Sequence, residues 1–381
     1  MPFKSIFVLV LAACPAWAAQ NLTVQQLADL LASLKKAQKT DAEVAAQLQD
    51  VELKEELSRS ALNSLAPFVP GQLSTEQMFI LEARSAMLAP PAGMLPATPA
   101  PDAAAQKAIL DKAFDYASKT FKQLPAITAG KATRRFQDNA NLNQGSIAAH
   151  SSAVVAPASS PIRYAGGTEA TVTFQGGAEQ LPAEPQKTEW GANGMIALLE
   201  PGPALSTVMD QAQSAGKIAW VRWQEVNGKP AAVFSFAVDK KKSHYDVDYC
   251  CFPDTDQAGP MSMRGTAGAA GGSMGNYLVN AEWKPFKATV PFHGEIFVDP
   301  ETGVISRLIT QADFKSSEWI RQEDQRIDYD ATTVAGQTMV LPARAIVLTL
   351  ELPYGDVGQG QFVLRHTLFT SAYANYQMTA H

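Results

Sequence analysis

The sequence predicts an α+β protein, in which a helical N-terminal region precedes a long, curved antiparallel β-meander of half-barrel type packed with helix. Apolar residues recur at helical spacing over residues 22–90, alternation with a period of two begins near Thr128, and a proline-rich segment separates the two regions. A hydrophobic content of 46% over 381 residues is enough for two folding units with real cores. The net charge of −6 gives no electrostatic footprint for nucleic acid.

Residues 1–18 have the layout of a secretory signal peptide. Lys4 precedes an apolar run, and Ala16-Trp17-Ala18 offers small residues where a signal peptidase cleaves, so the mature chain is expected to begin near Ala19. We therefore expect a periplasmic or secreted protein. Leu11-Ala12-Ala13-Cys14 also matches the box before a lipidated cysteine, and anchoring through Cys14 stays open as the alternative. No later apolar run reaches the ~20 residues of a transmembrane helix, so no such segment is expected in the mature chain.

Residues 19–88 are expected to be helical. Thr23 and Gln26 form a capping-box pattern, after which leucines recur at helical spacing. Further helices are expected to begin near Asp41, Leu53 and Ser74. Each is short and amphipathic and must bury its apolar stripe against a neighbour.

Residues 89–101 form a linker with five prolines and almost no charge, which favours a semi-rigid, extended conformation. The domain of residues 102–381 follows, and Asp102 is expected to cap a helix that ends at Leu124-Pro125. A second, short helix is expected near Ser206 to Gln213.

The rest of this domain is expected to be strands joined mostly by short turns. Asn227-Gly228 is a strong hairpin signal, the segment from Asp299 to Gly303 suits a tight turn, and residues 258–276 form a glycine-rich loop. The expected strands span residues 217–226, 230–238, 243–251, 286–298, 303–314, 326–334, 338–352 and 361–370.

Alternation along these strands predicts one apolar and one wet face. Ile346 and Leu348 face one way and Thr349 the other, while Ile296 opposes Glu295 in the same manner. The apolar face must be covered by helix, by a second sheet or by a ligand.

Several segments resemble a group of uncharacterised exported bacterial proteins. The resemblance covers roughly residues 105–376 and lies in Leu124-Pro125, Thr133-Arg134-Arg135-Phe136, the run from Gly294 to Gly303 with Arg307-Leu308, Arg326-Ile327-Asp328-Tyr329 and Leu341-Pro342-Ala343. A helix feeding a long antiparallel meander is also distantly similar to the half-barrel of the periplasmic lipoprotein carriers. That similarity implies a concave apolar face that holds acyl chains.

Catalytic and metal-binding patterns are weak. Ser273 satisfies the Gly-x-Ser-x-Gly pattern but lies in the glycine-rich loop, without the strand and helix of a nucleophile elbow. The five histidines show no metal-ligand spacing, so neither a metal site nor a cofactor is expected. The adjacent Cys250 and Cys251 are interpreted as two thiols on opposite faces of a strand, with a vicinal disulfide or a soft-metal site as alternatives.

The predicted function is non-enzymatic binding of a lipid or another apolar ligand on the concave face of the sheet. A wide apolar surface left in water would cost ~25 cal/mol per Å², which favours a bound partner. The candidate lining residues, chosen by strand parity, are Trp220, Phe234, Phe236, Ile296, Leu308, Ile346 and Leu348. The alternative is a structural or interaction protein of the envelope with a self-filled core and an envelope protein partner. A serine hydrolase is the third.

We expect sequencing of the native protein's N-terminus to recover a peptide that begins near Ala19, because signal peptidase reads Ala16 and Ala18. Mass spectrometry of the same material is the control for modification. A lipid-modified Cys14 would contradict soluble export and make a membrane an obligatory partner.

Overall fold

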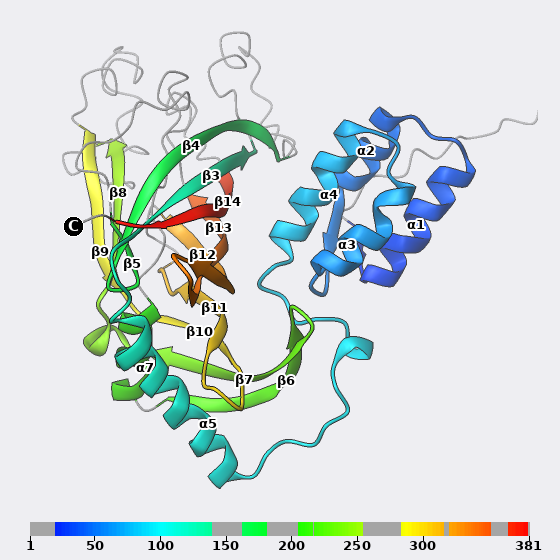
Figure 1. The fold of residues 1–381 in the computed structure, drawn as a ribbon. Coiled ribbons are helices and arrows are strands. Elements are labelled where there is room, and N and C mark those ends of the chain that lie inside the picture. Colours follow the sequence, from blue (N-terminus) through cyan, green and yellow to red (C-terminus); the bar gives the residue numbers. More distant parts are fainter. Residues whose placement is uncertain are drawn as a thin grey trace, which may run out of the picture.

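The computed structural model describes residues 20–138, 162–180, 205–215, 217–253, 283–315, 320–351 and 365–379. It confirms the α+β class, because helices accompany a large, open, antiparallel sheet of ten strands (Figure 1). The first eighteen residues, with Cys14, and the glycine-rich loop, with Ser273, lie outside the described residues.

The N-terminal part of the chain folds into a helical unit with its own small core. Its elements are β1 (Gln20–Leu22), α1 (Val24–Lys36), α2 (Asp41–Gln49), β2 (Val51–Leu53), α3 (Arg59–Leu65), a 3-10 turn (Ala66–Phe68) and α4 (Gln72–Arg84). The capping box predicted at Thr23 and Gln26 is present. The strands β1 and β2 pair in parallel, and buried leucines such as Leu27 and Leu31 form the core between the helices.

The linker leads from this unit to the helices of the second domain. It contains one short 3-10 turn (Ala92–Met94), and the indole Nε1 of Trp223 donates a hydrogen bond of 2.9 Å to the carbonyl of Pro99. Asp102 caps α5 (Ala103–Asp115) by accepting from the amide of Ala105 at 2.8 Å. The helix α5 continues as a π-helical turn (Tyr116–Phe121), and α7 (Leu205–Ala215) lies nearby.

The ten strands follow the order β5-β4-β3-β14-β13-β12-β11-β10-β7-β6, and all neighbours are antiparallel. They are β3 (Ile127–Gln137), β4 (Arg163–Gln175), β5 (Ala178–Gln180), β6 (Ile218–Val226), β7 (Lys229–Val238), β10 (Phe292–Val298), β11 (Ile305–Ala312), β12 (Ile320–Val334), β13 (Gln337–Glu351) and β14 (Arg365–Met378). The sheet therefore begins and ends with segments from the first half of the domain, while its middle is a continuous meander.

Two details of the meander differ from the sequence prediction. The expected strand over 286–298 is divided at Pro291, which has no N–H to donate, into β9 (Trp283–Val290) and β10. The strand β8 (Tyr245–Pro253) pairs with β9 in a separate two-stranded ribbon, so β7 pairs with β10 instead. The hairpin turn at Asn227-Gly228 is as predicted, with φ values of 51° and 75°.

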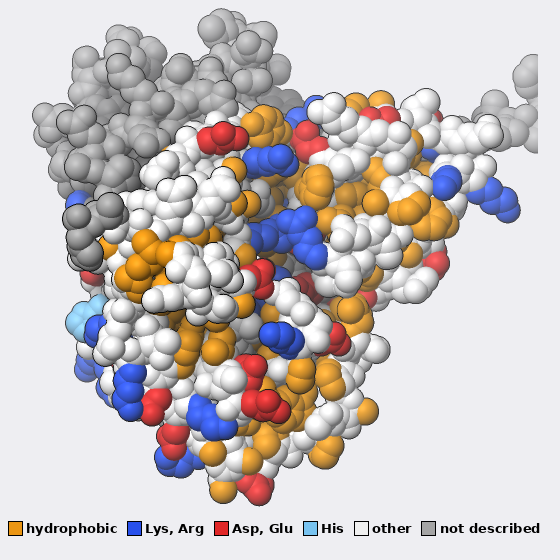
Figure 2. Space-filling view, viewed as in Figure 1, with side chains coloured by type: hydrophobic (Ala, Val, Ile, Leu, Met, Phe, Trp, Pro, Cys, Tyr) orange, Lys and Arg blue, Asp and Glu red, His pale blue; other side chains and the backbone are white. Residues whose placement is uncertain are grey.

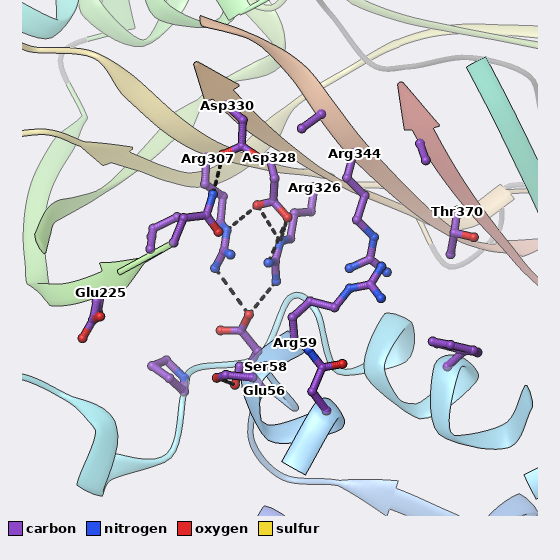
Figure 3. A pocket seen from close by; sticks show the side chains of 18 of the residues that line it. Glu56, Ser58, Arg59, Glu225, Arg307, Arg326, Asp328, Asp330, Arg344 and Thr370 are labelled. Atoms are coloured by element: carbon purple, nitrogen blue, oxygen red, sulfur yellow. Dashed lines mark hydrogen bonds and ion pairs between the residues drawn. The ribbon is translucent and has the colours of Figure 1, made fainter. Parts of the chain in front are cut away.

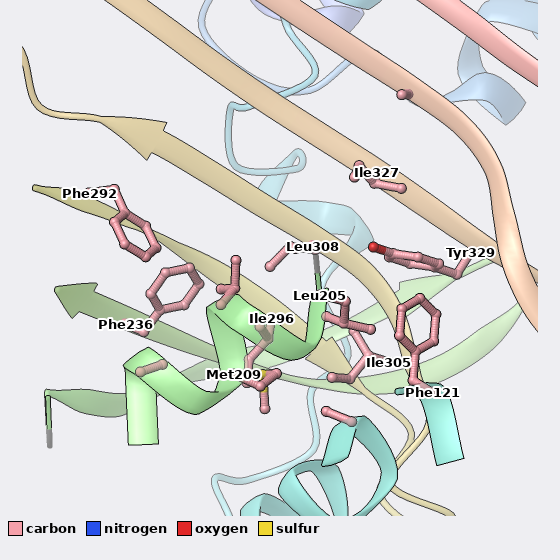
Figure 4. Packing of buried hydrophobic residues seen from close by; sticks show 14 of the residues in the cluster. Phe121, Leu205, Met209, Phe236, Phe292, Ile296, Ile305, Leu308, Ile327 and Tyr329 are labelled. Atoms are coloured by element: carbon pink, nitrogen blue, oxygen red, sulfur yellow. The ribbon is translucent and has the colours of Figure 1, made fainter. Parts of the chain in front are cut away.

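Helices cover both faces of the sheet, at least in part. On the concave face α5, the π-helical turn and α7 pack against strand residues such as Phe236, Ile296 and Leu308 (Figure 4). On the opposite side, here called the outer face, Ile80 and Ala83 of α4 pack against Ile346, Leu348 and Leu368. The helical unit therefore covers part of the outer face.

Replacing Gly294 with alanine is expected to lower the free energy of unfolding by about 2–3 kcal/mol. A Cβ on Gly294, in β10, would overlap the carbonyl group of Ile309 on the paired strand β11. Gly130→Ala in β3 is the matched control, because its Cβ would meet nothing closer than the carbonyl oxygen of Ala374 at 3.6 Å. Equal loss of stability in the two variants, measured by urea denaturation, would contradict this account.

Candidate functional site

The seven residues predicted to line one binding surface lie on two faces of the sheet. Phe234, Phe236, Ile296 and Leu308 are buried in the concave-face core, and Trp220 packs at its edge, with its ring 5.5 Å from that of Phe234. Ile346 and Leu348 lie instead on the outer face beneath α4, so the prediction of a single surface is wrong for these two. Both faces carry buried apolar side chains, and parity alone does not tell them apart.

The concave face is also less apolar than predicted. Toward one end it carries buried polar side chains on β3, β12, β13 and β14, among them Arg135, Gln137 and Glu323. Arg135 donates to Gln137 at 2.8 Å and lies over the ring of Phe369, and the hydroxyl of Tyr245 donates to Glu323 at 3.3 Å. A surface of this kind is suited to a hydrogen-bonded core rather than to acyl chains.

The other candidate residues are dispersed. The backbone of Cys250 and Cys251 belongs to β8, but their side chains lie outside the described residues, as does Ser273. His293 is half exposed and lies 2.9 Å from Asp313, while His366 lies 2.7 Å from Asp138 on a distant strand. Among the residues that the structure describes, no three His, Cys, Asp or Glu side chains are placed to share a metal ion.

A cleft lies between the helical unit and the outer face of the sheet. This cleft has a volume of about 990 Å³ and runs from the turn between β6 and β7 to β3. The helical unit and linker contribute residues such as Ser58, Phe79 and Met94, and the sheet contributes residues such as Arg134 and Arg344. Figure 2 shows basic side chains gathered in the hollow where the two parts of the molecule meet, with hydrophobic side chains beside them.

A buried network of ion pairs holds the helical unit to the sheet at the centre of the cleft (Figure 3). Glu56, in the loop before α3, accepts from Arg326 at 2.6 Å and from Arg307 at 3.3 Å. Asp328 accepts from the same two arginines, from Arg307 at 2.6 Å and from Arg326 at 3.0 Å. Arg326 also donates to the carbonyl of Ala86, just beyond α4. Strand pairing creates this arrangement, because Arg307 and Asp328 are opposed on β11 and β12.

The electrostatics of the network favour its ionised form. Burial alone would raise the pKa of the Asp328 carboxyl, but Arg307 and Arg326 outweigh that effect and hold the pKa well below its ordinary value. The pKa of Arg326 is correspondingly raised, because its carboxylate partners outweigh the cost of burial. A carboxyl group whose pKa lies this far below 7 stays ionised and is a poor general acid or base at pH 7.

A second ion-pair cluster lies closer to β3. Glu82 of α4 is buried and receives both ends of the Arg344 guanidinium, at 2.5 and 2.6 Å. The Nε of Arg59 lies 3.6 Å from the same carboxylate. Burial and the neighbouring charge of Arg344 lower the pKa of Arg59. Two guanidinium groups, which lie beside each other in Figure 3, therefore share one carboxylate, which neutralises only one of their charges.

The remaining lining of the cleft combines one more cation with apolar groups, with polar side chains and, near the β6–β7 turn, with the exposed carboxylates of Glu225 and Asp330. Arg134 projects from β3 onto the outer face, is exposed, and has no hydrogen-bond or ion-pair partner within the described ranges. Phe136, two residues further on the same strand, and Phe79 line the cleft as well. Met94 of the linker lines it and is 49% exposed. The cleft can therefore accept both a negative charge and an apolar body.

Sequence reasoning did not single out these residues as a site. Arg134, Arg307, Arg326 and Asp328 lie in three separate segments of the chain, and no local motif joins them. The alternation of charge at Asp324, Arg326 and Asp328 was the available signal, since a strand puts all three on one face. The sequence did not predict that this face is buried, because the helix that covers it, α4, lies far away in the chain.

Comparison with known proteins does not assign the chain to a family. No family model, no curated protein and no solved structure matches it. Within the described part of the chain, none of the helices is both long and apolar enough to cross a membrane.

Replacing Asp328 with asparagine is expected to lower the free energy of unfolding at pH 7 by about 3–5 kcal/mol, because two buried arginines would keep only Glu56. Since the folded pKa is depressed, the stability from this carboxylate is fully present above its unfolded pKa of ~3.9 and is lost as the pH falls through the folded value. The difference from wild type should narrow below about pH 4.

Asp330→Asn serves as the control, because Asp330 lies two residues further on the same strand, lines the cleft and is exposed. We expect this variant to unfold within about 0.5 kcal/mol of wild type at pH 7. Denaturant titrations of both variants between pH 3 and pH 7 measure the effect. A pH-independent deficit in Asp328→Asn would show that the charge is not its cause.

Proposed function

We propose that this protein is an exported, non-enzymatic binding protein that holds an amphiphilic ligand in the cleft between its helical unit and the outer face of its sheet. The single observation that carries the proposal is the cleft itself, which has a volume of about 990 Å³ and combines arginines with exposed apolar groups. Sites of this size, with an apolar wall and a few polar groups, are typical of small-ligand binding. The signal-like residues 1–18 support export.

The packing of the two faces favours the outer cleft over the concave face that the sequence suggested. Phe234, Phe236 and Ile296 are buried beneath α5, the π-helical turn and α7, so a ligand there would have to displace helices. The outer cleft needs no such displacement, because its apolar groups include the exposed Met94.

The chemistry of the cleft supports binding rather than catalysis. Its buried carboxylates, Glu56 and Asp328, are both engaged with arginines, and the low pKa of Asp328 keeps that group ionised. The hydroxyls of Ser58 and Ser60 lie 3.0 Å apart and bond to each other. Nucleophilic catalysis requires a hydroxyl beside a general base, and the described cleft residues do not supply that pair.

An envelope structural protein that docks a partner is the second candidate. It is favoured by the filled concave core, in which side chains such as Phe292 and Ile296 are fully buried by the protein's own helices. This candidate requires no small ligand in the cleft.

Protein purified from the cell that makes it is expected to carry a bound amphiphile, seen as a mass adduct in native mass spectrometry and identified after solvent extraction. Ala132→Phe should reduce the adduct several-fold, because the exposed Ala132 lines the floor of the cleft and a phenyl ring would fill it. Ala374→Phe is the matched control. Ala374 is exposed on β14, two residues beyond Ala372, which pairs with Ala132, and it does not line the cleft.

Both variants should unfold at the wild-type temperature, since neither alanine is buried. Wild-type protein without any adduct, or equal adducts in both variants, would contradict ligand binding in the cleft. The structural candidate would then replace it.

A further inference from the structure

The end of the cleft nearest β3, here called the arginine end, brings together Arg59, Arg134 and Arg344 from three separate elements. Arg59 comes from α3, Arg344 from β13 and Arg134 from β3, and all three line the cleft. β14 lies between β13 and β3, and its Thr370 pairs with Arg134 in register. Arg344 pairs with Ala372, two residues along β14 from Thr370, so Arg344 and Arg134 lie on the same outer face in neighbouring rows.

The arginine end carries more positive than negative charge. Glu82 is the carboxylate that pairs with Arg344, and both of its oxygens are taken by that guanidinium. Arg59 approaches Glu82 only at 3.6 Å, and Arg134 has no partner among the described residues. The other arginines of the cleft, Arg307 and Arg326, are already neutralised by Glu56 and Asp328.

The like charges at this end are only partly screened by water. The side chain of Arg344 is 15% exposed and that of Arg59 54%, so their mutual repulsion is not fully damped. The lowered pKa of Arg59 reflects burial and the proximity of Arg344. A bound anion would relieve this repulsion and would accept hydrogen bonds from guanidinium groups that have donors to spare.

Apolar surface lies directly beside the charge. The half-buried ring of Phe79 on α4 and the 49% exposed side chain of Met94 line the cleft. Phe136, two residues from Arg134 on β3, is buried in the cluster beneath α4 and contributes only its edge to the lining. A free inorganic anion would use the arginines and leave the exposed part of this apolar lining in water. A molecule with an acidic head and an apolar body would use both.

We propose that the arginine end binds the oxyanion head, a carboxylate or a phosphate, of an amphiphilic ligand whose apolar body lies against the half-buried Phe79 and the exposed Met94. This assignment rests on the proposed function and adds to it the charge and the position of the ligand's head. Guanidinium groups match both oxyanions because their N–H donors form a planar fork.

Isothermal titration calorimetry of the full mature chain tests the assignment with four probes. Dodecyl phosphate and laurate carry the two oxyanions on one apolar chain, dodecyl maltoside carries the chain without charge, and inorganic phosphate carries the charge without the chain. Each amphiphile is used below its micelle-forming concentration. We expect both acidic amphiphiles to bind about ten-fold more tightly than the maltoside and than inorganic phosphate. Added salt should weaken only the charged probes.

Arg134→Gln is the decisive variant, because Arg134 is exposed and holds no other residue in place. It should weaken the acidic amphiphiles about ten-fold and leave the maltoside unchanged. Arg163→Gln is the matched control, since Arg163 is exposed on the neighbouring strand β4 and does not line the cleft. It should bind all four probes as wild type does.

The outcomes separate this assignment from the proposed function. Equal binding of charged and neutral amphiphiles, or no effect of Arg134→Gln, would overturn the oxyanion site and leave ligand binding in the cleft intact. The result that inorganic phosphate binds as tightly as dodecyl phosphate, and loses that binding in Arg134→Gln, would show an anion site. It would overturn the claim that the ligand has an apolar body. Binding of none of the probes would overturn both proposals.

Discussion

The ion pairs of Glu56 with Arg307 and Arg326 determine where the helical unit stands on the sheet. The apolar contacts of α4 with Ile346 and Leu348 are not directional and would tolerate several positions. Buried charges are not so tolerant, because any shift that separates Glu56 from its arginines leaves desolvated charges without partners. The network therefore contributes more to the choice of one docked position than to the total stability of the fold.

That choice of position also creates the cleft. Bulky arginine and carboxylate side chains stand between the helical unit and the sheet, and Glu82 with Arg344 forms a second support. The two parts of the molecule meet through these supports and through a limited apolar contact, so space remains along the outer face. A hydrophobic interface of the same extent would have closed it.

The architecture could be predicted from the sequence, but the assignment of faces could not. The hairpin at Asn227-Gly228, the cap at Asp102 and the alternation in β13 are local signals, and each is found as expected. The strands β3 and β4 were not predicted, because glycines and charged residues interrupt their alternation and their pairing is supplied by β14. Ile346 and Leu348 were placed on the wrong face for a related reason. Alternation separates two faces, but it does not say which one a distant helix covers. The candidate site was missed because Glu56 lies 251 and 270 residues from its two arginines in sequence.

The last strand of the chain has a consequence for the order of folding. β14 lies in the interior of the sheet, between β13, which precedes it, and β3, which was made more than 200 residues earlier. The strands on its two sides cannot be joined into one sheet until residues 365–378 have been made, so the sheet of this domain is completed late. Strand pairing between segments far apart in the sequence also forms slowly during folding. Until β14 has been made, β13 and β3 each present an unpaired strand edge, which is the surface on which another β-strand could add.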